Sequence, residues 1–186
     1  MVDVSVLRGV QQQFLQQVCG LYVSDSPVLF LSASVLSEQY RLFVSAAPPA
    51  TAVFYAVKTN PDPRVLAHLA SLGSGFDVAS VGEIDVVLDS TGVSPSRLSY
   101  GNTVKPASDI AYAYRRGVRL FVADSLAELG KLAVHAPGSR VFLRLAAQNS
   151  SAAFGLGNKF GARAEDLPGL ARFAVSRGLA VEGVSF

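Results

Sequence analysis

The chain has 186 residues and a mass of 19.5 kDa, which is the size of one domain or of a large part of one. Half of its residues are hydrophobic, only 16% are charged, and the formal net charge is +2. This composition excludes an intrinsically disordered chain. It also argues against nucleic acid as a partner, since no basic run is longer than Arg115-Arg116. No apolar run approaches the roughly 20 residues that span a bilayer, so we expect no membrane partner.

The first 50 residues are predicted to form two segments. In residues 1–27, apolar side chains recur every three or four positions and predict an amphipathic helix, namely at Val6, Leu7, Val10, Phe14 and Val18. In residues 28–50 we expect a short strand over 28–31 and a helix over about 34–43. The breaker Ala46-Ala47-Pro48-Pro49 follows this helix.

From Thr51 onward, short apolar runs typical of strands alternate with stretches typical of helices. The predicted strands are residues 52–57, 75–78, 97–100, 119–122, 141–145 and 180–186. The predicted helices are residues 64–72, 81–89, 107–115, 126–135 and 166–177. This alternation indicates βαβ units and a parallel sheet.

Two architectures fit such a repeat, a (β/α)8 barrel and a doubly wound open sheet. An open sheet that binds a dinucleotide has a glycine-rich turn after its first strand. Residues 57–63 contain no glycine, so we predict an α/β fold with an incomplete (β/α)8 TIM-type barrel over 51–186, with about six of eight strands. The active site of such a barrel lies at the carboxyl ends of its strands.

Five of the predicted strands finish in a polar or ionisable residue, namely Lys58, Asp77, Asn102, Asp124 and Arg144. Lys58 is the most informative, because desolvation at a barrel mouth lowers the pKa of an amine and makes it a nucleophile toward carbonyl compounds. A solvated lysine at a strand end is the open alternative. Arg144 lies between apolar neighbours, where a guanidinium requires an anionic partner. Glu83 fits a helix cap as well as a site.

Other candidate groups give weaker signals. His68 and His135 fall in predicted outer helices, and we assign them structural roles. No cluster has metal-ligand spacing, and the single cysteine, Cys19, forms neither a thiolate site nor an internal disulfide. Gly155-Leu156-Gly157 is too short to identify a phosphate loop. One cysteine and no secretory signal favour a cytoplasmic location.

Five ordered stretches resemble the fold type III pyridoxal-phosphate decarboxylases, the family of ornithine, lysine, diaminopimelate and arginine decarboxylases. They are Phe54-Tyr55-Ala56-Val57-Lys58-Thr59-Asn60, Gly75-Phe76-Asp77-Val78-Ala79-Ser80 with Glu83, Tyr100-Gly101-Asn102 with Lys105, Leu143-Arg144-Leu145, and Lys159-Phe160-Gly161. The stretches around Lys105 and Lys159 are more similar to the ornithine/lysine branch than to the diaminopimelate branch. The resemblance covers about residues 28–186.

The resemblance implies a role for each matching residue. Lys58 is expected to carry the cofactor pyridoxal 5'-phosphate, Asp77, Glu83 and Arg144 to line the cofactor pocket, and Lys159 to lie near a homodimer interface. The implied reaction is decarboxylation of a small basic amino acid, ornithine or lysine, to a diamine. The cofactor accepts the electron pair that remains when carbon dioxide leaves.

Several features of the family would follow Phe186. They are a histidine directly after the Gly-Val-Ser-Phe strand, a glycine-rich phosphate loop, the acidic partner of the pyridine nitrogen and a second, β-rich domain. We therefore expect the chain to be a portion of a longer enzyme, without its C-terminal β domain and inactive by itself. A racemase-like or cofactor-carrier barrel and a non-catalytic regulatory relative remain alternatives.

Overall fold

The computed structural model describes residues 29–146 and 160–186, and the chain divides into two compact units, Met1–Thr51 and Ala52–Phe186. The helix predicted within residues 1–27 lies outside the described part. In the first unit, helix α2 (Ala33–Ala46) begins after Ser32, whose hydroxyl accepts a hydrogen bond from the Val35 N–H at 3.4 Å. The strand predicted over 28–31 is not found at residues 29–31. Leu29 is 83% exposed, and the described residues of this unit contain no second strand to pair with it.

The described residues of the second unit form six strands and five α-helices in alternation. The strands are β1 (Phe54–Ala56), β2 (Gly75–Val78), β3 (Leu98–Tyr100), β4 (Leu120–Ala123), β5 (Arg140–Arg144) and β6 (Ala180–Ser185). The helices are α3 (Pro63–Ser71), α4 (Val81–Thr91), α5 (Ala107–Arg115), α6 (Leu126–His135) and α7 (Leu167–Ser176). The predicted alternation is confirmed. The first strand is shorter than expected, because a 3₁₀ turn, η1 (Val57–Thr59), follows it and carries Lys58. A second 3₁₀ turn, η2 (Pro95–Arg97), precedes β3.

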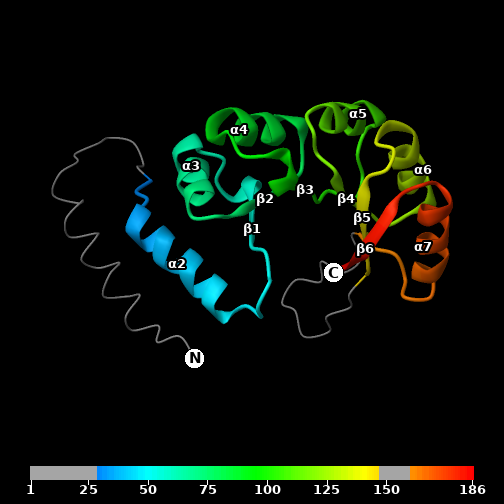
Figure 1. Cartoon of the computed structure of the whole chain (residues 1–186), viewed down its shortest axis with the longest axis horizontal. Helices are drawn as coiled ribbons and strands as arrows, with labels where there is room; N and C mark the ends of the chain where they lie inside the picture. The colour runs from blue at the N-terminus through cyan, green and yellow to red at the C-terminus, as the bar shows by residue number, and fades with distance from the viewer. Residues whose placement is uncertain (1–28, 147–159) are drawn as a thin grey trace. The chain divides into compact units, whose positions relative to one another are not determined.

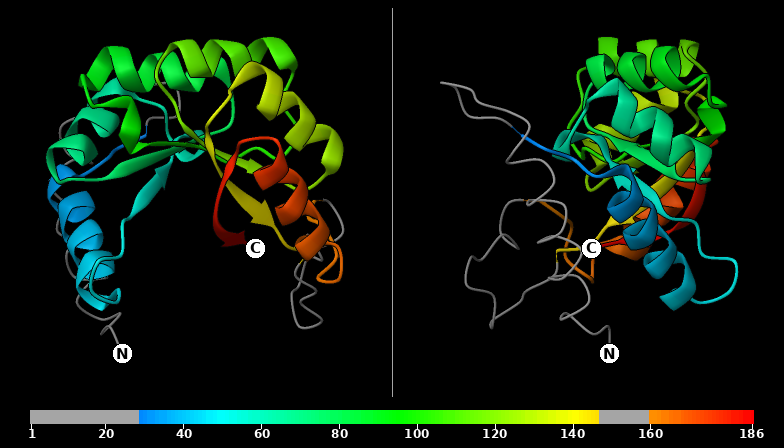
Figure 2. Two further views of the ribbon diagram at one scale, coloured as in Figure 1. Left: turned by 45° about the vertical axis from the view of Figure 1, so that its right-hand side comes forward. Right: turned by 90° about the vertical axis from the view of Figure 1, so that its left-hand side faces the viewer.

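The six strands form one parallel sheet in the order β1-β2-β3-β4-β5-β6. Each strand therefore pairs with the next strand along the chain, which is the order of a (β/α)8 barrel. In a doubly wound sheet the order reverses part-way. Within this unit, helices α3 to α7 lie side by side along one side of the curved sheet (Figures 1 and 2).

The sheet and its helices bury a continuous apolar core. Both faces of the central strands are covered, since every residue of β3 and β4 is buried. The rings of Tyr100 and Phe121 lie 6.1 Å apart within this core. Ser80 and Ser125 cap α4 and α6 by accepting hydrogen bonds from the N–H groups of Glu83 and Glu128, so each helix begins at a defined residue directly after a strand.

The connection after β5 returns to the end of that strand. Ala162 forms a parallel bridge with Leu145, and the Ala162 N–H donates to the Arg144 carbonyl at 2.8 Å. Gly161 adopts a φ of 111°, and a Cβ there would come within 2.7 Å of the Ala146 Cα. Only glycine fits this turn without strain. The segment that carries Phe160 is thereby held beside Arg144.

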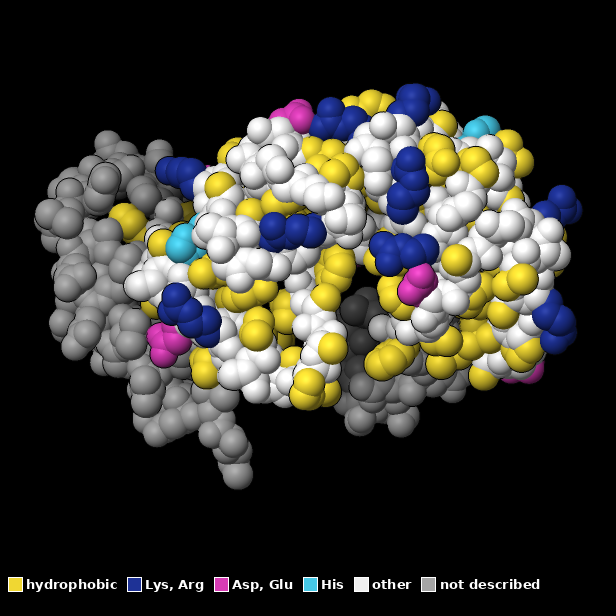
Figure 3. Space-filling view, viewed as in Figure 1, with side chains coloured by type: hydrophobic (Ala, Val, Ile, Leu, Met, Phe, Trp, Pro, Cys, Tyr) yellow, Lys and Arg dark blue, Asp and Glu magenta, His cyan; other side chains and the backbone are white. Residues whose placement is uncertain are grey.

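No helix in the described residues is long and apolar enough to cross a membrane. On the face drawn in Figure 3, lysine and arginine side chains are dispersed among hydrophobic ones. Exposed large hydrophobic residues of the second unit include Val104, Leu126, Val134, Val175 and Val184.

Candidate active site

The polar residues at the strand ends fall into two groups. Asn102 and Asp124 hold loops: the Asn102 Nδ2 donates to the Val104 carbonyl at 2.9 Å, and the Asp124 Oδ2 accepts from the Gly161 N–H at 2.9 Å. The side chains of Lys58, Asp77 and Arg144 form no such hydrogen bond to a loop within the described residues. These three ionisable groups remain available for chemistry at the carboxyl edge of the sheet.

Asp77 is the centre of this second group. It lies on β2 in register with Ala56 of β1 and Ser99 of β3. Burial raises the pKa of its carboxyl group, whereas the charge of Lys58, a hydrogen bond with Ser99 and the charge of Arg144 lower it; the charge of Glu83 raises it further. The net shift is upward. Lys58, Glu83 and Arg144, the three other residues predicted to bind the cofactor, therefore all act electrostatically on the partly buried carboxyl group of Asp77.

Gly101 makes room for that carboxyl group. A Cβ at position 101 would overlap Oδ1 of Asp77 and lie within 2.8 Å of its Cγ. The Gly101 N–H donates to the Val78 carbonyl at 2.9 Å, so the backbone is fixed at this point. Gly101, directly after β3, thus forms a wall in close contact with the Asp77 carboxyl group. The side chain of any larger residue at this position would overlap that group.

Lys58 differs from the other lysines of the described part. Its side chain is exposed in turn η1, and it has no hydrogen bond or ion pair to another described residue. Lys105 and Lys131 are both engaged with Glu128. The burial that the sequence led us to expect at Lys58 is absent, since β1 is paired only with β2 within the described sheet.

Glu83 also serves as a helix cap. Its Oε2 accepts a hydrogen bond from the Ala79 N–H at 2.8 Å, and its own N–H donates to the Ser80 hydroxyl at 3.3 Å. This reciprocal arrangement closely resembles a capping box. Glu83 therefore has a structural role, and its charge still acts on Asp77.

Arg144 ends β5 opposite Ser185 of β6. Its guanidinium carbon lies 5.5 Å from the centre of the Phe160 ring, a distance typical of a cation–π contact. Ser185 Oγ is buried and has no hydrogen-bond partner among the described residues. This edge of the sheet therefore carries a cation and an unsatisfied hydroxyl, both suited to an anionic ligand.

Other predicted residues lie elsewhere. His68 is in α3 and His135 is in α6. Lys159, Gly155-Leu156-Gly157 and Cys19 lie outside the described residues. Residues 29–146 and 160–186 contain no group of three or more His, Cys, Asp or Glu side chains that could hold a metal ion.

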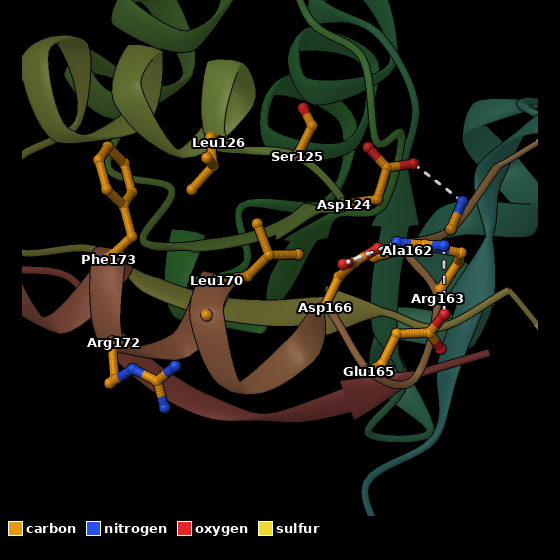
Figure 4. Close-up of a pocket in the computed structure, with 12 residues that line it drawn as sticks. Asp124, Ser125, Leu126, Ala162, Arg163, Glu165, Asp166, Leu170, Arg172 and Phe173 are labelled. Atoms are coloured by element: carbon orange, nitrogen blue, oxygen red, sulfur yellow. Dashed lines mark hydrogen bonds and ion pairs between the residues drawn. The ribbon is translucent and has the colours of Figure 1, made fainter.

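A pocket of about 650 Å³ lies between the end of β4 and helix α7. Figure 4 shows Asp124 and Leu170 on its walls and Arg163 directed toward Glu165 and Asp166. Arg163 is paired with both acids, at 3.3 Å and 2.9 Å. Lys58, Asp77 and Arg144 do not line this pocket, so it is distinct from the group around Asp77.

A match to a known protein family covers most of the chain. Residues 33–186 match the model of the pyridoxal-dependent decarboxylases, in the part described as the pyridoxal binding domain. The chain belongs to this family.

Individual relatives agree with the family match. The chain is 41% identical to an ornithine decarboxylase of Schizosaccharomyces pombe over 88% of its own length and 38% of the relative's. It is 40% identical to a lysine/ornithine decarboxylase of Selenomonas ruminantium, over 87% and 40%. It is also 41% identical to antizyme inhibitor 2 of Xenopus laevis, over 96% and 39%. The chain therefore spans about two fifths of the length of these relatives.

Solved structures of this family share the fold. The lysine decarboxylase of Selenomonas ruminantium matches with a TM-score of 0.78 at 36% identity, over 93% of this chain and 43% of that one. The lysine/ornithine decarboxylase of Vibrio vulnificus, complexed with putrescine, matches with a TM-score of 0.79 at 27% identity, over 94% and 44%. The six parallel strands and their helices thus match the TIM-barrel domain of the type III decarboxylases.

Two contacts of the Asp77 carboxyl group, with Ser99 and Gly101, and one buried charge outside the site, Glu128, were not predicted from the sequence. Ser99 is identified only by the register that places it opposite Asp77. Gly101 lies in a recognised stretch, but its close approach to Asp77 depends on the packing of neighbouring strands. Glu128 occupies the third position of a Ser-x-x-Glu helix start, which hides the fact that it is buried against Lys105.

Proposed function

We propose that this chain forms part of a pyridoxal-phosphate-dependent decarboxylase that converts ornithine or lysine to the corresponding diamine. The observation that carries the proposal is an exposed amine without a hydrogen bond or ion pair in the described residues, Lys58, whose charge acts on the partly buried carboxyl group of Asp77 at the carboxyl edge of the sheet. A free amine at this edge is suited to bind an aldehyde cofactor. A homodimer with Lys159 near its interface and a cytoplasmic location complete the proposal.

The residues at the strand ends fit pyridoxal phosphate. Lys58 would supply the amine that holds it. Asp77 supplies a carboxyl group whose raised pKa favours retention of a proton, while Gly101 leaves the space that this group occupies. Arg144 and Glu83 set the local charge. The bound cofactor supplies an electron sink for the bond that breaks between the α-carbon and the carboxylate.

A regulatory function is the second candidate. It is favoured by the 41% identity to a protein named antizyme inhibitor 2, a name that denotes regulation and not catalysis. The unengaged amine of Lys58 favours the decarboxylase, because a protein without the reaction has no need for it.

The test is the reaction of the longest natural protein that contains this chain, loaded with pyridoxal phosphate. We expect carbon dioxide and one diamine in equal amounts from L-ornithine or L-lysine, with no D-isomer formed. Racemisation without carbon dioxide would indicate the racemase-like alternative. A lack of both reactions in a protein that binds cofactor would favour the regulatory relative.

A further inference from the structure

A cluster of three charged side chains lies beside the loop that follows β3, apart from the residues around Asp77. The Nζ of Lys105 is 3.1 Å from Oε1 of Glu128, and these side chains are 0% and 3% exposed. Lys131 lies 2.6 Å from the other oxygen of Glu128. A charged pair so deeply buried is tolerated only when its polar atoms are well partnered.

The ammonium group of Lys105 is fully partnered. Its Nζ donates to the carbonyl oxygens of Asn102 and Val122, each at 2.7 Å, in addition to Glu128. An ammonium group has three donors, so none remains for a ligand. Lys105 is therefore not a second reactive amine. Its side chain ties the loop after β3 to strand β4 and helix α6.

The backbone of the same loop is fixed at both ends. At residue 105, the N–H donates to Glu128 Oε1 at 3.2 Å and the carbonyl accepts from Lys131 Nζ at 2.5 Å. At residue 101, the N–H donates to the Val78 carbonyl at 2.9 Å. Between them, the Lys105 ammonium holds the carbonyl of Asn102, the residue next to Gly101.

We propose that Lys105 is a positioning residue for the cofactor pocket, because through Asn102 it holds Gly101 against the carboxyl group of Asp77. Gly101 leaves no space for even a methyl group beside Asp77, so a small shift of this loop changes where the carboxyl group lies. The inference about the pocket rests on the proposed function. The effect of Lys105 on the position of Gly101, through the Asn102 carbonyl, does not depend on the proposed function.

The test compares two variants of the longest natural protein that contains this chain. Lys105→Met with Glu128→Gln removes the ammonium, leaves no unpaired buried carboxylate and keeps an acceptor for the backbone N–H of residue 105. Arg97→Met is the matched control, because Arg97 precedes β3 and donates to the carbonyls of Ala70 and Ser74, at the other end of the strand. Lys105→Met alone is measured as well, in case the double change fails to fold.

Two readouts are taken: hydrogen exchange of the Gly101 amide without cofactor, and the dissociation constant of pyridoxal phosphate. In the double variant we expect the exchange rate of the Gly101 amide and the dissociation constant of pyridoxal phosphate each to increase about tenfold, beyond what any change in global stability explains. In the Arg97 control we expect neither to change by more than about twofold. Equal values in the two variants at matched stability would show that the Lys105–Glu128 pair is only structural. If the unmodified protein binds no cofactor, the proposed function fails, and the Gly101 exchange still decides the role of Lys105.

Discussion

At the residue scale, the candidate site is built on a carboxyl group that the fold does not favour in its charged form. Burial raises the pKa of Asp77 more than the nearby cations and Ser99 lower it. Residues with perturbed pKa values in such positions are characteristic of functional sites, where stability is lost in exchange for reactivity. Asp77 and its wall, Gly101, therefore allow two predictions.

The first prediction concerns the pH dependence of stability without cofactor. A carboxyl group with a raised pKa in the folded state binds protons more tightly there than in the unfolded chain. Its contribution to stability is therefore present below its unfolded pKa of about 3.9 and is lost as the pH rises through the folded value. Asp77→Asn cannot ionise, so the variant avoids the destabilisation that the charged carboxylate causes as the pH rises. We expect the variant to be more stable than the unmodified protein at neutral pH and the difference to shrink toward pH 4, as measured by urea unfolding. A difference that grows toward acid pH would contradict the assigned direction of the shift.

The second prediction concerns the wall. Gly101→Ala places a methyl group against the Asp77 carboxyl group, so we expect a loss of about 1–3 kcal/mol in the free energy of unfolding and weaker binding of pyridoxal phosphate. Gly130→Ala in α6 is the control, because a Cβ there meets nothing within 4 Å. It is expected to stabilise by about 0.5–1 kcal/mol with unchanged cofactor binding. Equal effects of the two changes would refute the close fit at Gly101.

At the element scale, Glu83 combines a cap with a charge, and the two can be separated. Glu83→Gln keeps an acceptor for the Ala79 N–H, so we expect a change in stability within about 0.5 kcal/mol, but a lower pKa of Asp77, since the charge that raises it is removed. Glu83→Ala also removes the cap and is expected to cost about 0.5–2 kcal/mol. Chemical unfolding and NMR titration of Asp77 measure these effects. A large loss of stability in Glu83→Gln would show that the charge itself supports the fold.

Elements with clear periodicity and caps were predictable, and those that depend on tertiary contacts were not. The sequence predicts α5 (Ala107–Arg115) and α6 (Leu126–His135) at their observed limits, because apolar spacing and a proline or serine mark where each begins. The strand expected over 28–31 is not found at residues 29–31, since a strand requires a neighbour. Lys58, Asp77 and Arg144 stood out as polar groups after apolar runs. The roles of Ser99, Gly101 and Lys105 depend on register and burial, which no local pattern encodes.

At the scale of the whole molecule, the described sheet has two edges, β1 and β6. Open edges with exposed apolar side chains associate with other chains. We expect the 186-residue chain by itself to release no carbon dioxide from ornithine or lysine and to self-associate. Val184→Lys, on edge strand β6, is expected to reduce the association measured by light scattering. Val134→Lys, on helix α6, is expected to reduce it less, although Val134 is the more exposed of the two, at 72% against 49%. A monodisperse, active chain would contradict this prediction.

The most direct test of the account is the position at which pyridoxal phosphate attaches. The chain has four lysines, Lys58, Lys105, Lys131 and Lys159, and Lys105 and Lys131 are engaged in the charged cluster with Glu128. Borohydride reduction of the cofactor-loaded natural protein, followed by peptide mapping, locates the modified residue. We expect stoichiometric label on Lys58 and its loss in Lys58→Ala. Stoichiometric label on Lys105, Lys131 or Lys159 with Lys58 unmodified would contradict the assignment of Lys58 as the cofactor-binding residue.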